Sequence, residues 1–176
     1  MRVQYKGKEN ITDGVGLLIS ILLRYPEVSV VRYELEHNTL VFSFIFAKSL
    51  EKEQLAKIKA QLLEAIETWH YLERNQVEIL EITSEETSQL ESNQLTKIEL
   101  QRDMESFALE EVSLLVNLIN YLGLPLLTEE AEAFLEEDLI LQEEVIRHLL
   151  DNVKNCDCEK DLFAFREEGR VLVFNH

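Results

Sequence analysis

The chain has 176 residues, 46% of them hydrophobic, and a net charge of −17. This length and apolar content suit one ordinary domain or two small ones with a packed core, and they exclude an intrinsically disordered chain. No apolar run is long enough to span a bilayer, the first ten residues contain no apolar signal region, and two cysteines do not make a disulfide framework. We therefore expect a cytoplasmic protein.

The acidic residues are concentrated in the second half of the chain. The first 83 residues carry 10 Lys and Arg against 12 Asp and Glu, whereas the rest carries 7 against 22. Such a surface repels phosphate backbones and anionic membranes, so we expect neither nucleic-acid binding nor membrane binding. It is compatible with a basic protein partner, and it also serves as an ordinary solvated surface.

The first part of the chain alternates between strand and helix patterns. Residues 2–6 alternate apolar and polar side chains, and a helix follows that ends before Pro26. Residues 28–47 are typical of a β-hairpin, residues 50–72 of an amphipathic helix, and residues 77–83 of a further strand. The order β-α-β-β-α-β is that of the ferredoxin-like fold, which we predict here.

The turn of the first hairpin predicts its register. A two-residue loop at His37 and Asn38 suits a type I′ turn. This loop places Tyr33 opposite Phe42 and Val31 opposite Phe44, so that the aromatic side chains share one face. We expect that face to be buried in the core.

Two apolar surfaces of this first unit have no partner within it. The other face of the hairpin carries Val30, Val41 and Ile45, and the first helix, with Leu18 and Leu22, is apolar nearly all the way round. These five residues form the predicted interface. Either the second half of the chain or a second subunit covers it, and we favour a homodimer because symmetric dimers are the commonest soluble assembly.

The polar residues 84–95 predict a linker or mobile loop between two units. The units are a ferredoxin-like α+β domain at 1–83 and an acidic α+β subdomain at 96–176. The subdomain is predicted as β-α-α-β-β: a strand at 96–104, a helix at 108–122, a helix at 128–154 with a break near Asp138, and an antiparallel hairpin at 162–174. The hairpin turn falls at Glu168 and Gly169, which pairs Phe165 with Leu172 and Phe163 with Phe174.

Candidate metal ligands are sparse. Cys156 and Cys158, with His148 and His176, offer thiolate and imidazole ligands for zinc, but structural zinc sites use paired ligand knuckles. Glu143, Glu144 and His148 resemble the ligands of carboxylate-bridged metal helices, which repeat Glu-x-x-His on several helices. Here Glu144 and His148 are four residues apart, and the sequence has no second copy. We therefore expect no metal or other cofactor, and no catalytic residue is assigned.

The motifs of nucleotide binding and of nucleophilic catalysis are also absent from the sequence, so we lean against an enzyme. The cluster of Trp69, His70 and Tyr71 either lines a pocket or belongs to the core. The apolar surfaces and the acidic half favour a non-catalytic protein-interaction or assembly module. The alternative is a small-ligand-binding regulatory domain that acts at a subunit interface.

Overall fold

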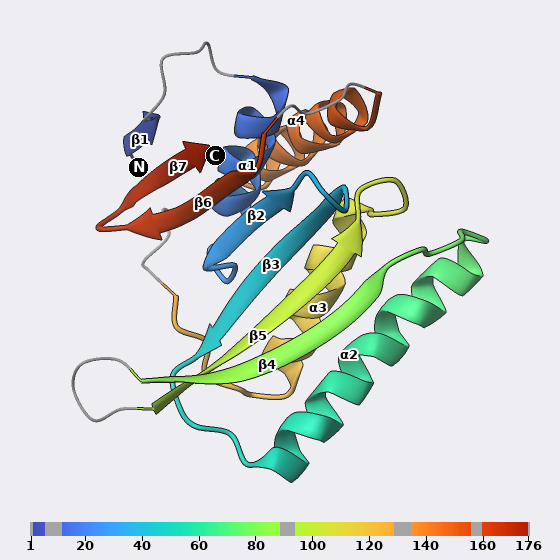
Figure 1. Ribbon diagram of the computed structural model, residues 1–176, viewed down its shortest axis with the longest axis vertical. Helices are drawn as coiled ribbons and strands as arrows, with labels where there is room; N and C mark the ends of the chain where they lie inside the picture. Colours follow the sequence, from blue (N-terminus) through green and yellow to red (C-terminus); the bar gives the residue numbers. More distant parts are fainter. Residues whose placement is uncertain (1, 6–11, 89–93, 129–134, 156–159, 176) are drawn as a thin grey trace.

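In the computed structural model, the described residues are 2–5, 12–88, 94–128, 135–155 and 160–175. Their strands form one seven-stranded sheet in the order β1-β7-β6-β2-β3-β5-β4 (Figure 1). β1 is parallel to β7, and all other neighbouring strands are antiparallel. The sheet is combined with four described helices, which confirms the α+β class. The elements are β1 (Arg2–Tyr5), α1 (Asp13–Arg24), β2 (Val30–Glu34), β3 (Thr39–Phe46), α2 (Lys52–Leu72), β4 (Leu80–Ser88), β5 (Gln94–Asp103), α3 (Leu109–Tyr121), α4 (Glu136–Asn155), β6 (Leu162–Glu167) and β7 (Arg170–Asn175).

The four described helices pack on one face of the sheet. Alternate strand residues such as Val31, Phe42, Leu100 and Ala164 point into this side and are at most 1% exposed. α1 lies between α4 and the β2-β6-β7 end of the sheet, while α2 packs against α3 and β4. In Figure 1, α1, α3 and α4 lie behind the sheet. The opposite face, which we call the open face, carries no described helix.

The ferredoxin-like pairing predicted for residues 1–83 is not the observed one. It would place β1 next to β3, but β5 occupies that edge of β3 from Thr39↔Asp103 to Phe46↔Thr96. β1 lies instead at the far end of the sheet, beside β7. The order of elements along a chain does not determine which strands pair. Here the long antiparallel pairing of β3 with β5 takes the edge that β1 would occupy in the ferredoxin-like fold.

The predicted linker at 84–95 lies largely within the sheet. Residues 84–88 complete β4, and Gln94 begins β5; residues 89–93 lie outside the described part of the chain. β4 is an edge strand, and an edge strand tolerates charged side chains that face water. The strands of the units predicted at 1–83 and 96–176 pair within one sheet and share one core.

The first hairpin has the predicted faces but a different register. Tyr33 pairs with Leu40 and Val31 with Phe42, two positions away from the predicted partners. The turn contains four residues, with the Asn38 N–H donating to the Leu35 carbonyl and Asn38 at φ 51°. The Tyr33 hydroxyl also donates to Asn38 Oδ1 at 2.8 Å. Because the shift is an even number of residues, the aromatic side chains stay on the core face.

Several predicted boundaries match the structure. The Thr12 hydroxyl caps α1 by accepting from the Val15 N–H, and α3 ends before Gly123, whose φ of 68° suits glycine. The β6-β7 hairpin has the predicted register, with Phe165 opposite Leu172. α4 starts at Glu136, close to the break predicted near Asp138, and residues 129–134 lie outside the described part of the chain. None of the described helices has the length and apolar content needed to cross a membrane.

Candidate functional site

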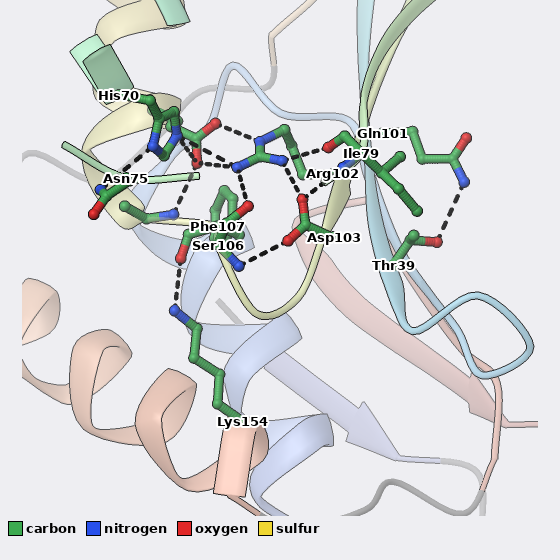
Figure 2. Close-up of polar contacts among 12 residues, drawn as sticks. Thr39, His70, Asn75, Ile79, Gln101, Arg102, Asp103, Ser106, Phe107 and Lys154 are labelled. Carbon is green, nitrogen blue, oxygen red and sulfur yellow. Dashed lines mark hydrogen bonds and ion pairs between the residues drawn. The ribbon is translucent and has the colours of Figure 1, made fainter. Parts of the chain in front are cut away.

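The densest polar cluster in the described structure surrounds Arg102, at the end of β5 (Figure 2). Its side chain is completely buried. Arg102 Nε donates to Glu111 Oε1 at 2.6 Å, Nη1 donates to Asp103 Oδ1 at 2.6 Å and to the Ile79 carbonyl, and Nη2 donates to Ser106 Oγ at 2.9 Å. A buried guanidinium requires such partners because the desolvation of an unpaired charge is costly.

Glu111 joins this cluster to two helices. It lies in the first turn of α3, where its Oε2 accepts from the Ala108 N–H at 2.8 Å. His70, at the end of α2, places Nε2 3.2 Å from the same carboxylate, and Asn75 lies 3.4 Å from His70 Nδ1. His70 Nε2 also lies 3.3 Å from Arg102 Nη2, so the imidazole contacts both members of the central ion pair. The cluster therefore ties the end of α2 and the start of α3 to β5.

Asp103 supplies a second carboxylate to the cluster. Burial raises its pKa, but the Ser106 hydroxyl, the backbone N–H groups of Ile79 and Ser106, and the Arg102 cation outweigh burial and lower the pKa to about 2. The two backbone N–H groups donate at 2.9 and 2.8 Å. Asp103 is therefore ionised throughout the neutral range and balances part of the Arg102 charge.

A polar hollow of about 480 Å³ lies beside the cluster. Lys154 of α4 lines it and donates to the Phe107 carbonyl at 2.8 Å, and burial lowers the pKa of this lysine. Within the described residues, no buried polar side-chain atom of the cluster lacks a hydrogen-bond partner. The hollow is also lined by Asn75, Gln76, Glu78, Asp103, Glu105, Ser106 and Ala108. Because the buried polar groups already bond to one another, we interpret the cluster as a structural connection that holds α2 and α3 to β5.

The five residues of the predicted interface do not form one surface. Leu18 and Leu22 are 1% and 0% exposed, because the sheet covers one side of α1 and α4 covers the other. Their assignment to an interface is therefore wrong, and the second half of the chain provides the cover. Val30, Val41 and Ile45 do lie together on the open face, where Val41 is buried and the other two are half-buried.

Beside Val30, the open face carries an aromatic cluster. Val30 pairs with Phe165 across β2 and β6, and Phe165 pairs with Leu172 across β6 and β7. The Phe165 ring lies 5.5 Å from the Phe163 ring and 5.7 Å from the Phe174 ring, measured between centroids. The sequence predicts this hairpin register, but it gives no signal that the hairpin pairs with β2. We call Phe163, Phe165, Leu172 and Phe174 the open-face cluster; all four are half-buried.

A row of ion pairs crosses the open face next to the cluster. Arg32 Nη2 lies 3.1 Å from Glu99 Oε2, and Lys97 Nζ lies 3.0 Å from Glu99 Oε1 and 2.6 Å from Glu85 Oε1. Burial lowers the pKa of Lys97, but its bonds to Glu85 and Glu99 outweigh this and raise the pKa. Positive and negative side chains therefore alternate along this part of the sheet.

The other sequence candidates are dispersed. Cys156, Cys158 and His176 lie outside the described residues. Glu143 pairs with Arg24 at 2.8 Å, and His148 contacts Asn152. No group of three or more His, Cys, Asp or Glu among the described residues is arranged to hold a metal ion. Of the Trp69-His70-Tyr71 run, Trp69 lines an apolar groove between α2 and α3, His70 is buried in the Arg102 cluster, and Tyr71 is exposed.

Comparisons of the chain with protein-family models, with curated proteins and with solved structures gave no match.

Proposed function

We propose that this protein is a non-catalytic interaction or assembly module that pairs with a second copy of itself through the open face of its sheet. The observation that carries the proposal is the open-face cluster, with three phenylalanine rings within 5.7 Å of a neighbour and no described helix over them. Apolar side chains gathered on a sheet face that no described helix covers are typical of protein interfaces. Val30 and Ile45, which are half-buried, extend the same surface.

The charges around the open-face cluster permit self-association. A chain with a net charge of −17 repels its own copies unless the contact surface is locally balanced. On the strands next to the cluster, Arg32 and Arg170 provide positive charge, and Glu34 and Glu167 provide negative charge. In a two-fold symmetric dimer the same surface of each subunit faces the other, so an evenly mixed patch is self-complementary.

Sedimentation velocity over a range of protein concentrations tests this proposal. We expect the wild type to sediment as a dimer and the Phe165→Glu variant as a monomer, because the new carboxylate would be buried without a partner at the contact. Tyr121→Glu is the matched control, since Tyr121 is 87% exposed on the helix side of the molecule and should leave the mass unchanged.

Circular dichroism of Phe165→Glu distinguishes a folded monomer from a misfolded chain. A second variant, Ile45→Glu, provides a further position on the same face. A wild type that stays monomeric at the highest concentrations would refute the self-association. The expected cytoplasmic location and the lack of nucleic-acid binding remain predictions that this experiment does not address.

A further inference from the structure

The helix side of the molecule carries a second apolar surface, on α4. Leu141 and Val145, one helical turn apart, are 59% and 52% exposed, and Ile140 beside them is 52% exposed. We call these three residues the α4 strip. A shallow hollow of about 200 Å³ lies between the strip and α1, where it is lined by Ser20, Leu23, Leu141, Gln142 and Val145. Large apolar side chains exposed at helical spacing beside a hollow suit the side chains of another helix.

Acidic side chains lie within and beside the α4 strip. At about 100° per residue, Glu137 and Glu144 fall between Ile140 and the pair of Leu141 and Val145, and Asp138 lies beside Val145. All three acids are exposed, and none of them forms an ion pair with a described residue. The surface therefore combines exposed apolar side chains with unbalanced negative charge.

The Arg and Lys side chains of α4 bond to groups outside the α4 strip. Arg147 Nη2 lies 3.1 Å from Glu110 Oε1, and Lys154 donates to the Phe107 carbonyl. No Lys or Arg side chain of α4 therefore balances the charge of Glu137, Asp138 or Glu144.

We propose that the α4 strip binds a basic amphipathic helix of another protein. Leucine-like side chains of the partner at i and i+3 or i+4 pack on Leu141 and Val145, and flanking Lys or Arg side chains pair with Glu137, Asp138 and Glu144. A second copy of this chain is a poor occupant, because its own acidic α4 would bring like charges together. The site lies on the opposite side of the sheet from the open-face cluster and does not depend on it.

A defined peptide tests this proposal directly. The probe is a fluorescein-labelled helix of leucine and lysine, about 18 residues and five turns long, with leucines on one face. Two reference peptides share its length: one replaces several residues by their D-enantiomers and cannot form the helix, and the other carries glutamate in place of lysine. Fluorescence anisotropy with the full chain should show the leucine–lysine helix binding at least about tenfold more tightly than either reference.

Matched variants locate the binding surface. Leu141→Gln should weaken the binding of the leucine–lysine helix by about tenfold, because it removes an apolar contact at the hollow. Leu72→Gln is the control: Leu72 is 71% exposed on α2, and its loss should change the affinity by less than about twofold. The double variant Glu137→Gln/Glu144→Gln should weaken binding and also reduce its dependence on salt concentration, since two of the screened charges are gone.

Three results would overturn the proposal. Equal binding of the D-substituted peptide would show that charge alone attracts the probe. An affinity of Leu141→Gln within about twofold of the wild type would place the peptide elsewhere. Equal weakening by Leu72→Gln would show that any exposed leucine contributes. The dimer variant Phe165→Glu keeps the α4 strip, so failure of self-association and failure of peptide binding are separate outcomes.

Discussion

The buried Arg102 cluster makes a quantitative prediction about stability. Arg102→Met keeps a long apolar side chain but removes the guanidinium, which leaves Glu111 as a fully buried carboxylate without its cation and deprives Asp103, Ser106 and the Ile79 carbonyl of a donor. Breaking a buried ion pair by removing one partner costs about 3–5 kcal/mol. Small domains are stable by only about 5–15 kcal/mol, so the variant should lose a large part of its free energy of unfolding.

The assay is urea unfolding followed by circular dichroism, with the free energy of unfolding extrapolated to water. Arg147→Met is the matched control, because Arg147 is 47% exposed and its pairing with Glu110 is a surface ion pair worth at most about 1 kcal/mol. Adding Glu111→Gln to Arg102→Met should recover part of the lost free energy of unfolding. The amide removes the unpaired buried charge but can still accept a hydrogen bond from the Ala108 N–H. A loss below about 1 kcal/mol for Arg102→Met, or no recovery in the double variant, would refute the reasoning.

Two further predictions concern stability. The pKa of Asp103 is lowered to about 2 in the folded state, so the stabilisation from its ionised form is present above pH ~4 and is lost as the pH falls toward ~2. Urea unfolding should find Asp103→Asn less stable than the wild type at neutral pH, and the difference should shrink on acidification. A difference that stays constant with pH would contradict this prediction. Leu22→Ala should cost about 2–5 kcal/mol because Leu22 is fully buried between the sheet and α4, whereas Leu72→Ala at an exposed position should stay within about 0.5 kcal/mol, and similar losses for the two would contradict the placement of α1.

Local patterns in the sequence predicted where the helices and strands lie better than they predicted which strands pair. The alternation in β6 and β7 and the turn at Glu168 and Gly169 determine that hairpin, because φ is positive at both turn residues and the strands are adjacent in sequence. In the first hairpin the same reasoning predicted the faces but not the register, since Asn38 alone has positive φ and its side chain accepts a hydrogen bond from Tyr33.

The strand order depends on contacts between distant residues, which periodicity does not report. The polar segment after Thr83 looked like a linker because an edge strand and a loop have similar compositions. The Arg102 cluster was missed for a related reason: Arg102 and Glu111 lie in segments that read as an ordinary strand and helix, and only the fold places His70 beside them. A charged residue at a core-facing strand position was the one available signal, since Arg102 shares the parity of Ile98 and Leu100.

The interleaved strand order also divides the sheet into two folding units. β2, β3, β5 and β4 come from one continuous stretch of chain, while the β6-β7 hairpin joins them only through β2, from Val30↔Phe165 to Tyr33↔Leu162. Contacts between residues so far apart in sequence form late and slowly, because a long loop must close first. We therefore expect the backbone amides between β2 and β6 to exchange with solvent sooner than those along the longer pairing of β3 with β5.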